Sequence, residues 1–182
     1  MDILETNRLF LRQFKPDDWE DLYEYLSLEE VVKYEPYDVK SKEECRREAF
    51  NRSKNTGFWA VCLKDNKKLI GNIYFQQQEP EDFMTWELGY VFNPQYYGEG
   101  YATEASEKML EYGFEKLDVH RITAGCNPDN TSSWRLLERL KMRREGYFIK
   151  PIFFKRDANR QPVWQDAYQY AILKEEWFKR NK

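Results

Sequence analysis

The hydrophobic period of this 182-residue chain changes repeatedly, and the order of the changes restricts the fold more than any other feature. One short alternating stretch is followed by two stretches of helical period, the second of which opens with a capping box, Ser41 and Glu44. Alternating and helical stretches then succeed each other to the end of the chain. The predicted strands cover residues 9–14, 58–63, 69–75, 83–92, 121–126, 146–154 and 162–173, and the predicted helices cover residues 16–26, 41–54, 101–117 and 130–140. This order predicts an α+β or α/β fold, in which helices cover the faces of one mixed sheet.

The composition fits a single domain, which we expect to span residues 1–182. Hydrophobic residues make up 41% of the chain and aromatic residues 17%, which is enough apolar surface for a sizeable core despite a charged fraction of 34%. The net charge is −3 and the basic pairs are scattered, so nucleic acid is a poor candidate for the main partner.

The cysteines and the N-terminal residues argue against several further classes of protein. Cys45, Cys62 and Cys126 are far apart and have no C-x-x-C or histidine companion, which disfavours a disulfide scaffold or a zinc site. The first residues mix acids and bases where a signal peptide needs about 7 to 15 apolar residues, and no long apolar run occurs elsewhere. We therefore expect a soluble, cytoplasmic protein that binds neither a metal nor a membrane.

The segment most informative about chemistry is W-E-L-G-Y-V-F-N-P-Q-Y-Y-G-E-G-Y-A-T-E-A, residues 86–105. A predicted strand leads into a loop with Gly98 and Gly100, and a helix begins directly behind them. Backbone N–H groups at the positive end of a helix bind phosphate, and glycine lets it approach closely. The next residues, Tyr101 and Ala102, are not the Lys and Ser or Thr of a nucleoside triphosphate loop, and the third glycine of a dinucleotide fold is missing. The loop therefore predicts a phosphate site for another kind of ligand.

The sequence Q-Y-Y-G-E-G at residues 95–100 fits Q/R-x-x-G-x-G/A and resembles the acyl-CoA pyrophosphate motif of the GNAT superfamily of N-acyltransferases. The downstream run L-D-V-H-R-I-T-A-G-C-N-P-D-N-T-S-S-W-R-L-L-E-R-L-K-M is similar to the strand, turn and helix that follow in that superfamily. Together with the early E-T-N-R-L-F-L-R-Q-F, the chain looks like the branch of ribosomal-protein N-terminal acetyltransferases, the RimJ/RimL type. The resemblance covers nearly the whole chain. One departure is L-K-M at residues 140–142, which lacks the glycine that the branch usually has after this helix.

This resemblance implies the GNAT fold, a mixed and mostly antiparallel sheet of about seven strands, flanked by about four helices and split between its fourth and fifth strands. Here those parallel neighbours are residues 83–92 and 120–126, with the pantetheine arm of acetyl-CoA in the opening between them. The backbone groups of Tyr90, Val91 and Phe92 would face the amides of this cosubstrate, and no metal takes part. The implied cofactor-binding residues are Tyr90, Val91, Phe92, Gln95, Tyr97, Gly98, Gly100, Tyr101, Ala102, Asn130 and Ser133.

Acetylation of an amine requires a proton acceptor, because the pKa is about 7.7–8.0 for an α-amino group and ~10.4 for Lys. Glu87, on the strand beside the cofactor, is the expected base, although a solvent-facing strand carboxylate would give the same pattern. Backbone N–H groups around Val91 and Phe92 would stabilise the oxyanion. The resemblance places Ser133 close to the cofactor sulfur, where a hydroxyl helps the thiolate to leave. The alternative is a structural serine in the first turn of a helix.

Other chemistry-bearing residues are better explained by structure. His120, the only histidine, lies at a strand entrance, where a structural role fits it better than the role of a base. Cys126 could lie near the thioester, but a small apolar strand residue is the simpler interpretation. The aromatic stretch at residues 147–154, with Trp164 on the next strand, could line an acceptor pocket, fill the core or form a homodimer interface.

The sequence thus predicts an acetyl-CoA-dependent N-acetyltransferase that transfers the acetyl group directly in a ternary complex, since no Cys–His pair supports a covalent intermediate. By resemblance the acceptor is a protein N-terminal amine. A small amine, such as a polyamine, an amino sugar or an antibiotic, is the alternative, because loops set specificity. A non-catalytic acyl-CoA-binding module and, least favoured, a nucleotide-binding protein are the competing classes.

Overall fold

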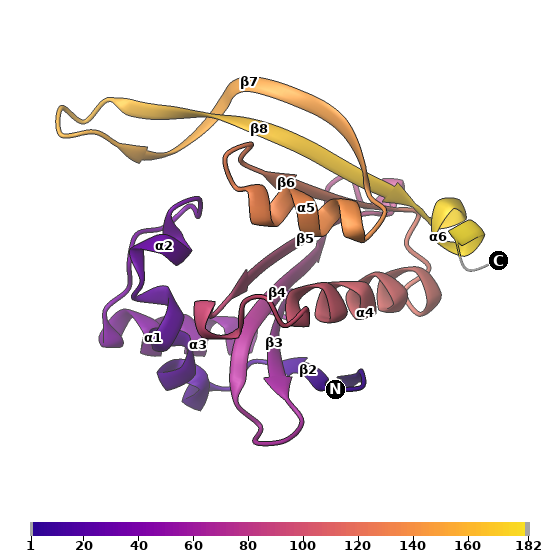
Figure 1. The fold of residues 1–182 in the computed structure, drawn as a ribbon, viewed down its shortest axis with the longest axis horizontal. Coiled ribbons are helices and arrows are strands. Elements are labelled where there is room, and N and C mark those ends of the chain that lie inside the picture. Colours follow the sequence, from indigo (N-terminus) through magenta and orange to yellow (C-terminus); the bar gives the residue numbers. More distant parts are fainter. Residues whose placement is uncertain (1, 181–182) are drawn as a thin grey trace.

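The computed structural model describes residues 2–180, which form one eight-stranded sheet with helices on both faces (Figure 1). The strands are β1 (Leu4–Glu5), β2 (Leu9–Gln13), β3 (Phe58–Leu63), β4 (Leu69–Gln77), β5 (Thr85–Phe92), β6 (Arg121–Cys126), β7 (Arg143–Arg156) and β8 (Pro162–Leu173). The helices are α1 (Trp19–Leu26), α2 (Glu29–Val32), α3 (Lys42–Lys54), α4 (Tyr101–Glu115), α5 (Thr131–Arg139) and α6 (Lys174–Arg180). Three short 3-10 turns are η1 (Pro16–Asp18), η2 (Glu81–Phe83) and η3 (Pro94–Tyr96). Within residues 2–180, no helix is long and apolar enough to cross a membrane.

The sheet is split in its middle. Its strand order is β1-β2-β3-β4-β5-β6-β8-β7, and every pair of neighbours is antiparallel except β5 and β6. These two strands pair only where residues 85–87 lie beside residues 121–123. Beyond Glu87, β5 stays on β4, while the whole of β6 stays on β8. The predicted mixed, mostly antiparallel sheet with a split between residues 83–92 and 120–126 is therefore confirmed.

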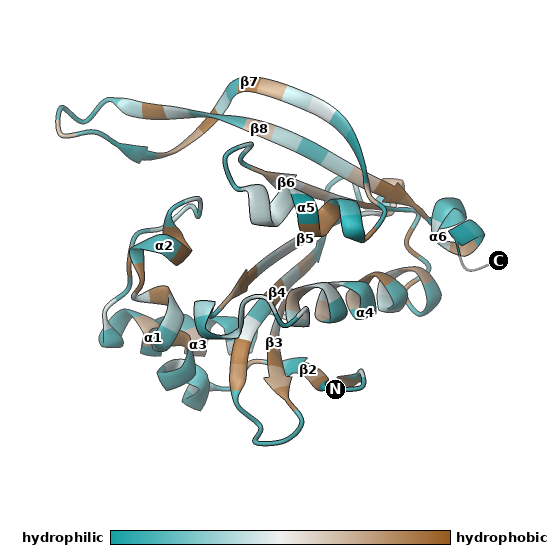
Figure 2. Ribbon diagram, viewed as in Figure 1, coloured by the Kyte–Doolittle hydropathy of each residue, from teal (hydrophilic) through white to brown (hydrophobic). Residues whose placement is uncertain are grey.

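Two hydrophobic cores, one on each face, hold β5 in place. On the face covered by α4 and α5, the core includes Leu88, Phe92, Met109, Ile122 and Leu137. On the face covered by α1 and α3, it includes Leu22, Tyr25, Cys45, Ala49 and Ala60, with Val91 packed against it. Figure 2 shows hydrophobic residues on the central strands that these cores enclose. Because successive residues of β5 point to opposite faces, both cores fix this strand beside the opening.

The structure differs from the sequence prediction mainly at element ends. Strand β5 begins at Thr85 rather than at residue 83, because η2 and the left-handed Met84, with φ 47°, turn the chain first. Strand β7 begins at Arg143 rather than at residue 146. Three elements, β1, α2 and α6, were not predicted. Strand β1, with two residues, and helix α2, with four, are too short to show a hydrophobic period. With α6, they bring the described residues to eight strands and six helices, where seven strands and four helices were expected.

The turn after α5 forms without the glycine expected by resemblance. Lys141 takes the left-handed conformation itself, with φ 62°. Its N–H donates to the Glu138 carbonyl at 3.0 Å, and the Met142 N–H donates to the Leu137 carbonyl at 3.1 Å, which closes the helix end. The turn thus forms with a lysine in the left-handed conformation, which costs about 1–2 kcal/mol of stability relative to glycine.

Candidate active site

The loop between η3 and α4 has the backbone conformation of an anion-binding turn. Gly98 and Gly100 adopt left-handed φ angles of 83° and 81°, and Gly100 caps the 15-residue helix α4. A Cβ atom at Gly98 would meet nothing within 4 Å, so the backbone angle, rather than lack of space, calls for glycine there. The first N–H groups of α4 therefore lie at the positive end of a long helix, directly behind an open loop.

Residues just before β2 anchor this loop. Arg8 Nε donates to the Glu104 carboxylate at 2.7 Å, and Arg8 Nη1 donates to the Glu99 carbonyl at 3.0 Å. The Arg8 guanidinium also stacks on the ring of Tyr101, 4.3 Å from its centre. The Thr6 hydroxyl donates to the same Glu104 carboxylate at 2.6 Å. Because Arg8 neutralises Glu104, that carboxylate does not oppose an anion at the start of α4.

Residues of β5 and α5 meet across the opening of the sheet. The Tyr90 hydroxyl lies 2.9 Å from Ser133 Oγ and donates to the Ser133 carbonyl at 3.1 Å. Asn130 caps α5, where its Oδ1 accepts the Ser133 N–H at 3.3 Å and the Ser132 hydroxyl at 2.9 Å. Burial raises the pKa of Tyr90, so its hydroxyl keeps its proton at neutral pH.

The register of β5 on β4 decides which backbone groups face the opening. The Asn93 N–H donates to Ile70 at 2.9 Å and the Gln78 N–H donates to Thr85 at 2.8 Å, which identifies the residues of β5 that bond to β4. In an antiparallel ladder every second residue forms these bonds. The N–H and C=O groups of Val91 are therefore directed toward β4 and not toward the opening. The N–H and C=O groups of Tyr90 and Phe92 are directed toward the opening.

A cavity of about 1060 Å³ passes through the unpaired part of the sheet. We call its two ends the cofactor half, lined by Tyr97, Gly98, residues 100–103 and α5, and the acceptor half, lined by Glu30, Val31, residues 34–37, Arg52, Tyr74 and Glu87. Ile152 and Phe154 of β7 and residues 165–167 of β8 also line the cavity. Of the predicted site residues, the cavity is lined by Glu87, Tyr90, Val91, Phe92, Tyr97, Gly98, Gly100, Tyr101, Ala102, Asn130 and Ser133.

Gln95 is the predicted residue that does not line the cavity. Its side chain is exposed, and its N–H donates to Asn93 Oδ1 at 3.1 Å. Asn93 is fully buried, and its amide nitrogen donates to Glu24 at 3.3 Å. Gln95 thus lies within η3, the turn that shapes the loop.

Glu87 points into the acceptor half from β5. It lies opposite Gln76 of β4 and beside Thr123 of β6, at the last paired position before the opening. Its side chain is half-buried, and this burial raises the pKa of its carboxyl group. No ion pair with another described residue lowers that pKa again. A carboxylate without a charge partner is free to take up a proton.

The acceptor half also holds charged residues that the sequence did not indicate. Burial raises the pKa of Glu35 to about 7, despite a hydrogen bond from Tyr37 and the positive charge of Arg52. Arg52 is 3% exposed, its Nε donates to Glu48 at 2.8 Å, and its Nη1 has no partner among the described residues. Neither residue stands out in the sequence, because their burial depends on where the segment 33–37 meets α3.

Arg139 is a further cation of the cofactor half. It lines the cavity from the end of α5, and its Nε donates to Thr103 Oγ1 at 3.3 Å, beside the first turn of α4. The sequence did not indicate this role, because Arg139 in the last turn of a predicted amphipathic helix has the pattern of an ordinary exposed basic residue. Its position beside Thr103, in the first turn of α4, suits an anionic ligand.

His120 and Cys126 behave as the simpler interpretation expects. His120 is exposed at the start of β6, outside the cavity, and its backbone bonds Met84 and Lys174. Cys126 lines the cavity, but burial raises the pKa of its thiol to about 11. A protonated thiol is a poor nucleophile, so Cys126 offers no nucleophilic chemistry at neutral pH. Within residues 2–180, no group of three His, Cys, Asp or Glu side chains is arranged to hold a metal ion.

Comparisons with known proteins agree with this geometry. Residues 8–143 match the family described as acetyltransferase (GNAT) domain. The chain is 42% identical over 177 residues to the uncharacterized N-acetyltransferase YnaD of Bacillus subtilis strain 168, covering 96% of this chain and 98% of that protein. The crystal structure of a GNAT-family acetyltransferase from Bacillus anthracis matches with a TM-score of 0.87 and 40% identity, covering 96% of this chain and all of that one (100%).

A more distant relative has a named substrate. The [ribosomal protein uS5]-alanine N-acetyltransferase of Escherichia coli strain K12 is 29% identical over 128 residues, which cover 70% of this chain and 63% of that protein. The family match and the close relatives together are decisive: the chain belongs to the GNAT family. It is an acetyltransferase, as its resemblance to that superfamily implied.

Proposed function

We propose that this enzyme transfers an acetyl group from acetyl-CoA directly to a primary amine bound in the same complex. The observation that supports this most strongly is the single cavity that joins the α4 loop on one face of the sheet to Glu87 on the other. Two ligands that enter from opposite faces can meet at the opening between β5 and β6. Because the Cys126 thiol stays protonated, direct transfer fits this site better than a covalent enzyme intermediate.

The residues of the cofactor half fit acetyl-CoA in shape and charge. The left-handed Gly98 and Gly100, the N–H groups of α4 and the guanidinium of Arg139 suit a pyrophosphate. The backbone groups of Tyr90 and Phe92, directed toward the opening, suit the amides of a pantetheine arm. When bound, acetyl-CoA supplies the acetyl group as a thioester, which is activated toward attack by an amine.

We assign the chemical steps of the transfer to groups on either side of the opening. Glu87 takes the proton from the acceptor amine, directly or through a water. The N–H groups of Tyr90 and Phe92 stabilise the negative charge that develops on the carbonyl oxygen. Tyr90 and Ser133, whose hydroxyls lie 2.9 Å apart, can donate hydrogen bonds to the departing thiolate. Burial raises the pKa of Tyr90 further above the thiol pKa of about 8.5, so Tyr90 stabilises the thiolate while keeping its own proton, and the thiolate leaves as CoA and takes its proton from solvent.

For the acceptor we propose a protein N-terminal amine. The relative that is named for the alanine of ribosomal protein uS5 supports this choice. An α-amino group also loses its proton more readily than a lysine, by about 2.5 pKa units. A small amine, whether polyamine, amino sugar or antibiotic, is the alternative.

A thiol-release assay with matched acceptors tests the proposal. We expect turnover with a short peptide that has a free N-terminal alanine and none with the same peptide acetylated at its N-terminus. Turnover only with spermidine or an amino sugar would overturn the peptide acceptor and leave the transferase intact. Glu87→Gln should abolish most turnover without weakening acetyl-CoA binding, which separates the chemical role of Glu87 from binding.

A further inference from the structure

The proposed transfer gives no role to Arg52, a buried cation near the end of α3. Its side chain is 3% exposed, and its guanidinium lies over the rings of Phe14 and Phe58, 5.4 Å and 4.7 Å from their centres. Its Nη1 has no hydrogen-bond partner among the described residues, although Arg52 lines the acceptor half of the cavity. Proteins rarely keep a buried donor without a partner, so one that lines a cavity points to a group on the ligand.

The charges around Arg52 leave one positive charge without a full counterion. Its Nε donates to Glu48 at 2.8 Å, and Lys40 lies 3.5 Å from the same carboxylate. Burial opposes the ionisation of Glu48, but the charges of Arg52 and Lys40 lower its pKa. Glu35 does not complete the set, because burial raises its pKa to about 7 despite the attraction of Arg52, and Glu30 is exposed to solvent. Two cations therefore share one ionised partner, which suits an anionic group on the ligand.

The strand register gives the distance between Arg52 and the expected base. Phe58 of β3 lies opposite Tyr74 of β4, which lies opposite Gly89 of β5, so these positions form one row on one face of the sheet. Glu87 lies two residues further along β5, on the same face. Strands are about 4.8 Å apart and rise about 3.3 Å per residue, which puts on the order of 10 Å between the guanidinium over Phe58 and the Glu87 carboxyl group.

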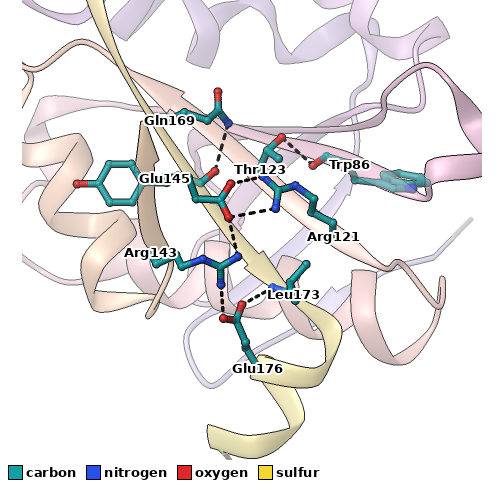
Figure 3. Close-up of polar contacts among 9 residues, drawn as sticks. Trp86, Arg121, Thr123, Arg143, Glu145, Gln169, Leu173 and Glu176 are labelled. Carbon is teal, nitrogen blue, oxygen red and sulfur yellow. Dashed lines mark hydrogen bonds and ion pairs between the residues drawn. The ribbon is translucent and has the colours of Figure 1, made fainter. Parts of the chain in front are cut away.

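Polar contacts at the paired ends of β5 and β6 fix the Glu87 end of this distance (Figure 3). The Thr123 hydroxyl donates to the carbonyl of Trp86, the residue before Glu87, at 3.3 Å. Arg121, two residues before Thr123, donates to Glu145 of β7 at 3.1 Å. These contacts join β6 to both β5 and β7, so the base is supported by ordered strands rather than by a loop.

This separation restricts the kind of acceptor. With the reacting amine about 3 Å from Glu87, about 7 Å remain between that amine and Arg52. The carboxylate of a free amino acid is too close, because it lies within one residue length, about 3.5 Å, of its own amine. Two residues of an extended chain span about 7 Å, so an acidic side chain on the second residue reaches Arg52. A polyamine has no oxygen that could accept the Arg52 N–H.

We therefore propose that Arg52 selects the acceptor by binding a carboxylate, and that the acceptor is a protein N-terminus whose second residue is Asp or Glu. This inference rests on the proposed transfer to an N-terminal amine and adds the residue that follows the reacting one. Arg52 contacts the ligand in this account and takes no part in the proton transfer.

The binding of matched peptides tests the proposal without requiring turnover. Three pentapeptides begin with a free alanine and differ only at their second residue, which is Glu, Gln or Lys. Calorimetric titration in the presence of CoA should show the Glu peptide binding at least tenfold more tightly than the Gln peptide, and the Lys peptide binding more weakly still.

A double variant tests the role of Arg52 itself. Arg52→Met/Glu48→Gln removes the buried cation together with its partner, so no unpaired charge is left in the core. It should bind the Glu and Gln peptides equally well within twofold. The matched control is Arg46→Met/Glu43→Gln, an exposed pair on the same helix outside the cavity, which should keep the tenfold preference. A purely structural Arg52 would change folding but not the ratio between the two peptides.

The outcomes separate this inference from the proposed function. Equal binding of the Glu and Gln peptides by the wild type, or tightest binding of the Lys peptide, would overturn the carboxylate site and leave transfer to an N-terminal amine intact. A folded double variant that keeps the preference would also overturn it, and the wild-type ratio decides if that variant does not fold. A Glu peptide that binds tightly but releases no thiol from acetyl-CoA would support the site and refute the peptide acceptor. Binding of none of the three peptides would overturn both.

Discussion

Gly100→Ala perturbs the cofactor loop by a defined amount. The φ angle of Gly100 is 81°, and a left-handed residue other than glycine costs about 1–2 kcal/mol. The new Cβ would lie 3.7 Å from Arg8 Nη2, an ordinary contact, so strain in the backbone is the main effect. For a chain of this size each kcal/mol lowers Tm by about 2–4 °C, which predicts a decrease of roughly 2–8 °C.

The ligand dependence of the same variant tests the role of the loop. If the loop holds the pyrophosphate, the variant should bind acetyl-CoA at least tenfold more weakly, measured by titration calorimetry. Gly125→Ala is the control for Tm alone, because Gly125 lines the same cavity. It lacks a positive φ, and its nearest neighbour, the Tyr168 carbonyl, would lie 3.9 Å from the new Cβ, so its Tm should stay close to that of the wild type. An unchanged Tm and an unchanged affinity for acetyl-CoA in Gly100→Ala would refute the reasoning.

Three further changes have defined outcomes. Glu87→Gln should lower kcat/KM by about 10²–10⁴ while Glu35→Gln lowers it less than tenfold, and the opposite ranking would make Glu35 the base. Burial raises the pKa of Glu35 to about 7, above ~4.3 in the unfolded chain. Between these two values the unfolded chain releases its proton more readily than the folded chain, so the wild-type protein loses on the order of 2 kcal/mol of stability as the pH rises from about 4.5 to 7. Urea unfolding should therefore show Glu35→Gln to be more stable than wild type at pH 8 and equal to it at pH 4, and equal stability at both would contradict the burial. Lys141→Gly should raise the free energy of unfolding by about 0.5–1 kcal/mol, because glycine adopts the left-handed angle freely, and a loss of stability in urea would show that the lysine side chain matters more.

Much of the fold follows from local patterns. The change of period after Gly57 identified the hairpin of β3 and β4, and the capping box at Ser41 located α3, where both of its reciprocal hydrogen bonds are present. The elements that the sequence missed are short or terminal. Four residues of α2 make a single turn, and a single turn cannot show which residues recur on one face.

The site divides in the same way. The roles of Gly98 and Gly100 can be predicted from the sequence, because a left-handed turn and the start of a helix depend on residues that are close together in the chain. Glu35, Arg52 and Arg139 are not, because each acquires its environment from elements that meet only in the folded chain. The direction of Val91 toward β4 likewise depends on the register between two strands, which the order of apolar residues alone does not define.

Thermal unfolding with acetyl-CoA, CoA, ATP and NAD in parallel tests the central claim most directly. A ligand that binds only the folded chain raises its stability, by about 2.7 kcal/mol at a hundred times its dissociation constant. We predict a clear rise in Tm with acetyl-CoA and CoA, little change with ATP or NAD, and a smaller rise in Gly100→Ala. No rise with either CoA species, or an equal rise with all four ligands, would contradict a cofactor site at the opening between β5 and β6.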